Sequence, residues 1–304
     1  MLTLNQIPKS VLFAAAGGSG GFAANLLSEI MMKPQQQTLG MILVHVTVWS
    51  AMICFGIGIL IMIAQNILLH KPPLVLQQCV PIIAGSAIGG GIAGFLAQLF
   101  YSISAAVLFA GGETVIMGLF HSVIARSAAW AMMGGITAFG MSYCIANLNK
   151  LWALLGGLIG GALGCIGFLI LTLIVGDAAG RLIGMSILGA CIGAMVGWVE
   201  STFRKVWLMV VFDPRNVAQV NLGTQLVTVG GSNRDIVFIP GAEASAGTFL
   251  LAGNTVQYKS KTGRQNLNPG DRISIGKVEL IVCSDDVQFA PSKFYPMRMS
   301  KVPR

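Results

Sequence analysis

Residues able to do acid–base, nucleophilic or metal chemistry are few in this chain, and their spacing matches no catalytic or metal-binding pattern. His45, His70 and His121 are scattered, and the cysteines form no CxxC pair, so a zinc site is not indicated. The sequence shows neither a Ser-His-Asp order nor two carboxylates placed for general acid–base catalysis. We therefore expect no enzymatic activity, no metal and no cofactor.

Two glycine-rich runs have the composition of loops that cradle nucleotide phosphates. These runs are Gly89–Gly94 and Gly156–Gly161. Neither follows a predicted strand or lies near a lysine of the Walker type, both of which a nucleotide loop needs. We interpret the glycines of both runs as packing glycines inside apolar helices.

The ionisable residues of the apolar part lie near the ends of its predicted helices. They are Glu29, Glu113, Asp177 and Arg181, with Arg126 at a helix start. A charge at the centre of a membrane costs about 2.5–3.5 kcal/mol on insertion scales, whereas a long side chain near a helix end reaches the interface. We therefore interpret these residues as interfacial, and we expect Asp177 and Arg181 to pair across one helical turn.

The elements that position these residues are apolar helices with a glycine at every fourth position. The clearest pair is Leu151–Val175 and Arg181–Phe203, joined by a short turn that contains Asp177. Glycines spaced by four lie on one face of a helix and allow a neighbouring backbone to come close. The glycines that we expect at helix contacts are Gly17, Gly21, Gly85, Gly89, Gly156, Gly160, Gly164, Gly189, Gly193 and Gly197.

The composition places the chain in the membrane class. Of its 304 residues, 55% are hydrophobic and 10% are charged, and the mean hydropathy is +0.77. Ordinary soluble domains carry about 25% charged residues. The sparse charges of the first two thirds and the frequent charges beyond Arg204 indicate a domain boundary near residue 205.

The sequence predicts about six transmembrane helices in three tandem hairpins. Their ranges are 10–32, 39–69, 78–109, 126–147, 151–175 and 181–203. The third is longer than one span requires, so we expect it to tilt or break near Tyr101. We expect the segment 115–124 to re-enter the membrane or to lie on its surface. Glycine clusters recur in the first helix of each pair, which is typical of a tandem repeat.

The distribution of Lys and Arg predicts the orientation of these helices. An even number of spans places both chain ends on one side of the membrane. Lys9, Lys71, Lys150, Arg204 and Lys205 lie on that side, whereas fewer bases lie on the other. Because cytoplasmic loops carry the excess of Lys and Arg, we expect both termini in the cytoplasm.

Beyond residue 205 the pattern changes to short β-branched runs separated by turn residues, which predicts a β-sandwich. The seven expected strands are 208–212, 225–229, 235–238, 248–251, 255–259, 272–275 and 279–283. The expected domains are a transmembrane part over 1–205, a sandwich over 206–290 and a basic tail over 291–304. We expect the tail to contact anionic lipid headgroups. The bases of the sandwich are dispersed, so we do not expect a nucleic-acid partner.

Two motifs of this second part resemble those of forkhead-associated (FHA) domains. Val227-Thr-Val-Gly-Gly-Ser-Asn-Arg-Asp-Ile-Val-Phe is similar to the opening strand, turn and strand of that family. Leu267-Asn-Pro-Gly-Asp-Arg-Ile-Ser-Ile-Gly is similar to its closing turn and strand. The whole chain also resembles bacterial multi-spanning proteins that end in an FHA domain. The resemblance implies a phosphothreonine-binding sandwich on the cytoplasmic side of a bacterial inner membrane.

The ligand residues of that family are only partly present. Ser245 is kept, but Gly231 stands where the family has an arginine, and Thr248 stands where it has a histidine. Loss of the arginine removes the strongest charge-assisted contact to a phosphate, which leaves Arg234 to reach it instead. The resemblance implies these residues for a partner or phosphopeptide: Gly230, Gly231, Asn233, Arg234, Ser245, Thr248 and Thr262.

Together these features predict a non-catalytic integral membrane adaptor or scaffold. The glycine faces favour a homo-oligomer in the lipid bilayer, and the FHA-like sandwich would dock a cytoplasmic protein or phosphoprotein. Two alternatives stay open. One is a channel or transporter lined by the hairpin repeats, and the other is a phosphothreonine sensor.

Overall fold

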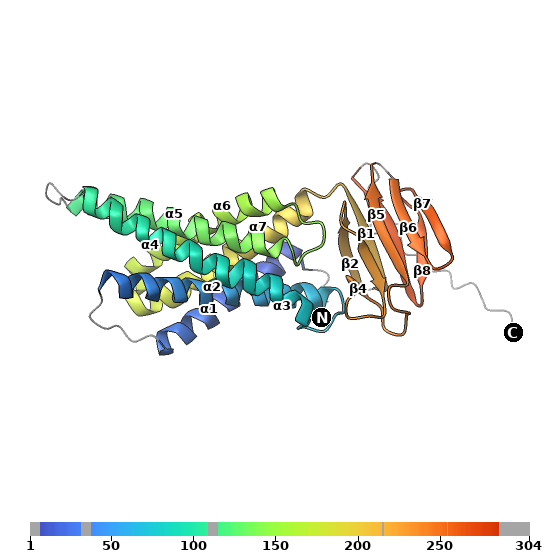
Figure 1. Cartoon of the computed structure of the whole chain (residues 1–304), viewed down its shortest axis with the longest axis horizontal. Helices are drawn as coiled ribbons and strands as arrows, with labels where there is room; N and C mark the ends of the chain where they lie inside the picture. The colour runs from blue at the N-terminus through green and yellow to red at the C-terminus, as the bar shows by residue number, and fades with distance from the viewer. Residues whose placement is uncertain (1–6, 32–37, 109–114, 215, 254, 286–304) are drawn as a thin grey trace.

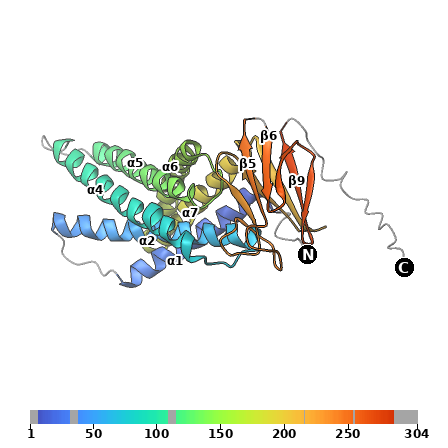
Figure 2. The same ribbon diagram turned by 45° about the vertical axis from the view of Figure 1, so that its right-hand side comes forward.

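The computed structural model describes residues 7–31, 38–108, 115–214, 216–253 and 255–285 of the chain. The expected basic tail at 291–304 and Glu113 lie outside the described residues. A helical part and a β-sandwich are stacked end to end (Figures 1 and 2). The last helix ends at Thr202 and the first strand begins at Val206.

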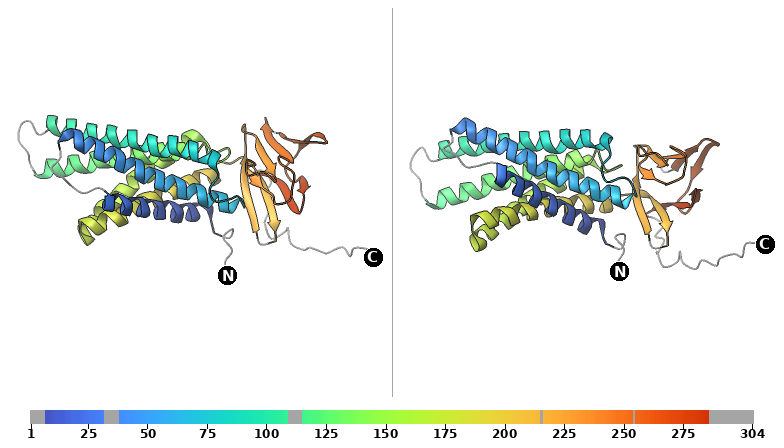
Figure 3. Two further views of the ribbon diagram at one scale, coloured as in Figure 1. Left: turned by 60° about the horizontal axis from the view of Figure 1, so that its bottom comes forward. Right: turned by 90° about the horizontal axis from the view of Figure 1, so that it is seen from below.

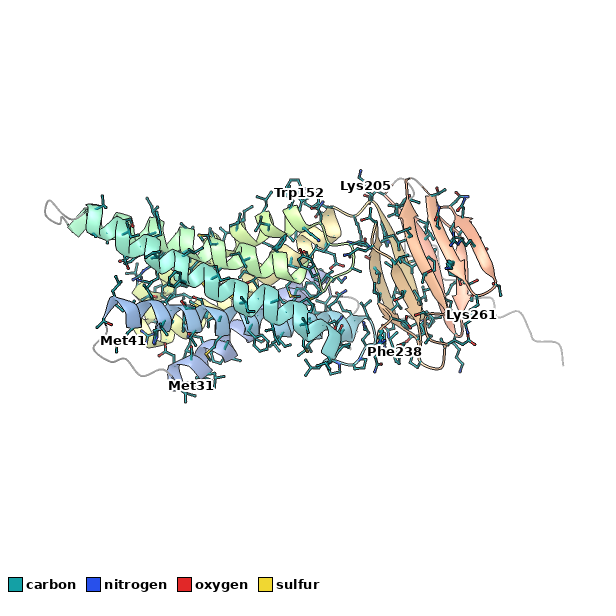
Figure 4. The ribbon with its side chains drawn as sticks, in the orientation of Figure 1. Met31, Met41, Trp152, Lys205, Phe238 and Lys261 are labelled. Carbon is teal, nitrogen blue, oxygen red and sulfur yellow. The ribbon has the colours of Figure 1, made fainter. Side chains whose placement is uncertain are left out.

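The helical part consists of long apolar helices. Their bounds are α1 Lys9–Met31, α2 Leu39–Leu68, α3 Leu76–Ile82, the π-helical segment η2 Ile83–Ile88, α4 Gly89–Leu108, α5 Val115–Met141, α6 Lys150–Val175 and α7 Asp177–Thr202. Five helical segments of the described chain are long and apolar enough to cross a membrane, namely Lys9–Met31, Leu39–Leu68, Gln78–Val107, Lys150–Val175 and Ala179–Thr202. Figure 4 places Met31 and Met41 at the end of the helices opposite the sandwich, and Trp152 beside it.

The described helices form a closed ring. Each packs on the next in the order α1, α2, α4, α5, α6 and α7, and α7 returns to α1. Phe13, Ile53, Ile57, Met185 and Leu188 are buried in the core of this ring. α4 and α5 extend furthest from the sandwich, whereas α1 begins beside it (Figures 1 and 3).

Two expectations about the middle helices differ from the structure. The segment 115–124 is not separate from the helix that follows it, because α5 runs unbroken from Val115 to Met141 and no proline interrupts it. The third helix is irregular at η2 and not near Tyr101. Pro81, which lacks the backbone donor, lies just before η2 and accounts for the change in hydrogen bonding.

The connection between the last two helices also differs from the expectation. Asp177 is the first residue of α7, and the turn before it is Gly176, whose φ is +81°. A glycine adopts this left-handed conformation without steric cost, which explains how two helices meet through one residue. α5 ends at Met141 rather than at Asn147, and a series of turns leads to α6.

The sandwich consists of two sheets in the described residues, with strand orders β2-β1-β9-β8 and β4-β3-β5-β6-β7. The bounds are β1 Val206–Asp213, β2 Asn216–Leu222, β3 Val227–Gly230, β4 Val237–Phe238, β5 Gly247–Ala252, β6 Thr255–Ser260, β7 Gly263–Leu267, β8 Arg272–Ile275 and β9 Val278–Ser284. The sequence expectation missed β2, in which Asn and Gln are interspersed with two valines, and β7, which has no β-branched residue. Each is an edge strand of its sheet.

Candidate functional site

Three connections of the sandwich bring most of the expected ligand residues to one end. Gly230 ends β3, and Gly231 donates its N–H to the Glu243 carbonyl at 2.8 Å. Ser245 lies so close that a Cβ built on Gly230 would be 2.5 Å from the Ser245 nitrogen. Lys261 in the β6–β7 turn pairs with Glu243 at 2.6 Å, which places this turn, and Thr262 within it, at the same end.

The other expected ligand residues differ in their surroundings. Asn233 and Arg234 are exposed on the β3–β4 connection, and the Arg234 N–H is donated to Ser232 Oγ at 3.2 Å. Thr248 lies on β5 and donates its hydroxyl to the Lys259 carbonyl at 3.3 Å. Thr248 therefore belongs to the sheet, whereas Asn233 and Arg234 are free to contact a ligand.

The centre of this loop cluster is Asp235, a residue that the sequence expectation did not single out. Its side chain is 1% exposed. It accepts the Ser232 N–H at 3.0 Å, the Ser245 N–H at 3.0 Å and the Ser245 hydroxyl at 2.8 Å. Both donors of Ser245 are thus committed to a carboxylate of the chain. A phosphate that bound at Ser245 would have to displace the carboxylate of Asp235, whose charge is also negative.

The α2–α3 connection binds the sandwich. Leu69 is 4% exposed and packs in the core cluster of the sandwich. The His70 ring lies 4.1 Å from the ring of Phe212, and Asn216 Nδ2 is 2.7 Å from His70 Nε2. The apolar side chain and the imidazole together hold this connection against the β1–β2 hairpin.

Lys71, the next residue, is buried beside the loop cluster. It is 8% exposed, and burial lowers the pKa of its ammonium below the ordinary 10.5, while the negative charge of Asp235 raises the pKa in part. Hydropathy alone gave no sign of this contact, because Lys71 follows a helix end where a solvated lysine is usual.

The lowered pKa of Lys71 predicts a pH dependence of stability. Between the lowered folded-state pKa and 10.5, the unfolded chain binds more protons than the folded chain, so the contribution of Lys71 to stability rises with pH. We expect the melting temperature of the wild type, relative to that of Lys71→Met, to increase between pH 7 and pH 10. Thermal unfolding of both proteins in detergent checks this, and a difference independent of pH would contradict it.

The α5–α6 connection makes a second contact with the sandwich through Asn147. Its Nδ2 donates to the Asn221 carbonyl at 2.9 Å and to the Gln225 carbonyl at 3.3 Å, and its Oδ1 accepts the Gln225 N–H at 2.9 Å. The φ of Asn147 is +55°, a conformation that asparagine tolerates better than most residues. We call this set of contacts the Asn147 clasp.

The first and last helices add a third contact beside the sandwich. Lys9 Nζ is 2.5 Å from Glu200 Oε1, and Asn221 Nδ2 donates to the Glu200 carbonyl at 2.9 Å. At the opposite end, Arg181 pairs with Glu29 of α1 at 2.7 Å. The expected partner of Arg181 was Asp177, four residues along the same helix. The side chain of Asp177 lies outside the described residues, so that expectation stays a prediction, whereas the contact with Glu29 across α1 and α7 was not expected.

The ten expected packing glycines all face other helices of the same chain. On α7, Gly189 meets Gly17, Gly193 meets Phe13 and Gly197 meets Ser10 of the first helix. Gly21 meets Met185. On α6, the residues Gly156, Gly160 and Gly164 meet Val199, Cys191 and Leu188 of α7, and the residues Gly85 and Gly89 of η2 and α4 meet Gly140 and Ile136 of α5. These contacts are internal, so they supply no argument for a homo-oligomer.

The part of the sandwich away from the helices is uncovered. β7 is an edge strand, and its residues from Gly263 to Asn266 are exposed. Lys259 of β6 lies directly opposite Arg264 of β7, and both side chains are exposed. Figure 4 shows Lys261 on the side of the sandwich away from the helices and Lys205 at the junction. Among the described residues, no group of three or more His, Cys, Asp or Glu is placed to hold a metal ion.

Comparison with known proteins gives limited matches. No family model matches the chain. No curated protein matches it. A solved structure described as "Structural and functional analysis of phosphothreonine-dependent FHA domain interactions" matches with 17% sequence identity and a TM-score of 0.23, over 26% of this chain and 95% of that one.

Proposed function

We propose that the protein is a non-catalytic integral membrane adaptor whose sandwich docks a protein partner at its outer edge. The observation that carries the proposal is the contrast between two edge strands of the sandwich, β2 and β7. β2 is covered by the helices through Asn221 and Asn216, whereas β7 is open. An uncovered edge strand presents unpaired backbone groups to which another chain can add a strand.

The charges at this edge favour an acidic partner. Lys259 and Arg264 are cross-strand neighbours, an arrangement that is unfavourable for two like charges. Among the described residues, neither forms an ion pair. Glu243 pairs with Lys261 and Glu279 pairs with Arg272 instead. An acidic segment beside β7 would relieve this repulsion. We therefore propose that the partner presents carboxylates or phosphates to Lys259 and Arg264.

The arrangement of the helices supports insertion in a membrane with the sandwich in the cytoplasm. Lys9 donates to the Gln219 carbonyl of β2 and Lys71 lies near Asp235 of the sandwich, and Lys150 and Lys205 lie at the same end of the helices. This excess of bases is what the positive-inside rule expects of a cytoplasmic face. A bacterial inner membrane, with both chain ends on its cytoplasmic side, is the location that we propose.

The partner surface is tested with a photocrosslinking amino acid at Gln265 of the full-length protein in its host membrane. We expect a protein crosslink at Gln265 and none at Thr224, which is exposed near the helices. The double variant Lys259→Glu/Arg264→Glu is expected to weaken the crosslink at least about fivefold, since each charge contact contributes on the order of 1 kcal/mol. Lys205→Glu, a charge reversal at the junction, serves as the control. Equal crosslinking in the double variant would reject the proposal.

Phosphothreonine sensing is the second candidate, because Arg234 and Ser245 are both exposed on adjoining connections. Asp235 argues against it, since its carboxylate holds both donors of Ser245. A phosphothreonine peptide, with its unphosphorylated form as control, distinguishes the two in the same assay. If the phosphorylated peptide alone reduces the protein crosslink at Gln265, and this reduction is lost in Arg234→Ala, the result would favour the sensor. The channel alternative gains no support from the core, where Ile57, Ile61 and Val196 are fully buried in the half of the ring beside the sandwich.

A further inference from the structure

A half-open cavity of about 460 Å³ lies between the helices, in the half of the ring away from the sandwich. Side chains of α2, α4, α5, α6 and α7 line it. Its volume is in the range of ligand pockets, which is roughly 300–1,000 Å³. Because the cavity is half open to the surface of the helical part, a ligand has access to it.

Two arginines line this cavity. Arg126 lies in the middle part of the 27-residue helix α5 rather than at a helix start, where the sequence had placed it. Arg181 of α7 lies across the cavity from it and pairs with Glu29. Among the described residues, no carboxylate forms an ion pair with Arg126. Arg126 is exposed on the apolar helix α5, and a cation at the mouth of a cavity there favours a ligand of opposite charge.

The remaining wall carries four aromatic side chains and the buried Ser50 among aliphatic and small residues, together with the polar residues Gln98 and Thr172. Trp130 and Phe168 face each other with ring centroids 4.8 Å apart, and Trp49 and Tyr101 line the cavity beside them. Ser50 is fully buried, and its Oγ has no hydrogen-bond partner among the described residues. A ligand that fits this wall needs a large apolar body and a polar group able to reach Ser50.

We propose that the cavity binds an anionic lipid, with its phosphate or carboxylate at Arg126 and Arg181 and its chain against the four aromatic side chains. The inference rests on the proposed insertion of the helices in a bilayer. Arginine suits this role, because its guanidinium binds phosphate and carboxylate through two donors at once. A small soluble anion would gain the arginine contacts but nothing from the aromatic wall.

The lipid proposal is tested by native mass spectrometry of the full-length protein in detergent. The probes are phosphatidylglycerol, phosphatidylcholine and inorganic phosphate at equal concentrations. We expect the wild type to retain phosphatidylglycerol at least about tenfold more strongly than phosphatidylcholine, the difference expected from one charge-assisted contact. We also expect inorganic phosphate not to displace the lipid. Equal retention of both lipids, or displacement by phosphate, would overturn the proposal.

Two variants probe the two halves of the cavity separately. Arg126→Gln removes the charge, and Ala129→Phe fills space at a residue that lines the cavity without changing any charge. Both are expected to lose the preference for phosphatidylglycerol, whereas Lys150→Gln, which removes a charge at the sandwich end, is expected to keep it. Melting temperatures confirm that each variant is folded. Folded variants that retain the lipid as the wild type does would refute the site, and the crosslink at Gln265 reports separately on the adaptor function.

Discussion

Replacement of Gly189 by leucine is expected to prevent the helical ring from closing. A Cβ built on Gly189 would lie 2.1 Å from the carbonyl oxygen of Gly17, and one built on Gly17 would lie 2.2 Å from the carbonyl oxygen of Gly189. The two backbones therefore touch, and no side chain can give way. Overpacking of a well-packed core typically costs about 1–3 kcal/mol, and we expect leucine to cost more because backbone has to move, against a total stability of about 5–15 kcal/mol.

The measurement is the yield of monodisperse full-length protein in detergent, together with its melting temperature. Gly189→Ala is expected to fold but to melt at a lower temperature, because even one methyl group forces α1 and α7 apart. Gly40→Leu is the matched control. Gly40 also lies in an apolar helix, but nothing lies within 4 Å of a Cβ built there. If Gly189→Leu melts at the wild-type temperature, α1 and α7 do not cross at this residue.

The spacing of glycines in the sequence was enough to locate the helix contacts but not to identify the partners. The fourfold spacing from Gly189 to Gly197 predicts a bare helix face, and the structure has close contacts there. The glycine spacing contains no information on which helix packs against that face. The next helix in a hairpin was the natural choice, yet these glycines face α1, and α7 presents other residues to α6. Closure of the ring is a property of the whole chain and leaves no local signal.

The residues that join the two parts were also beyond sequence reasoning. Leu69 ends an apolar run, and Lys71 follows it as an ordinary interfacial lysine would. Only the docked sandwich makes them buried. Arg126 was misplaced for a related reason, since a helix was expected to begin at it. The apolar residues from Val115 onward continue the same helix, so the charge lies inside it.

Loss of the Asn147 clasp is expected to release the β2 side of the sandwich from the helices. Asn147→Ala removes the three hydrogen bonds of the amide and places alanine at a φ of +55°. The hydrogen bonds contribute about 1 kcal/mol each, and the left-handed conformation costs alanine roughly 1–2 kcal/mol. A loss of about 4 kcal/mol corresponds to a change of about three orders of magnitude in the opening equilibrium.

Hydrogen–deuterium exchange of the full-length protein measures this opening at β2 and at Gln225. Asn147→Gly separates the two contributions, because glycine accepts the positive φ but lacks the amide, so its exchange is expected between those of wild type and Asn147→Ala. Asn149→Ala is the control. The Asn149 side chain caps α6 through the N–H groups of Leu151 and Trp152, so its loss weakens the helix start and leaves β2 protected. Unchanged exchange of β2 in Asn147→Ala would mean that the α2–α3 connection and the Lys9–Glu200 pair hold the sandwich without the clasp.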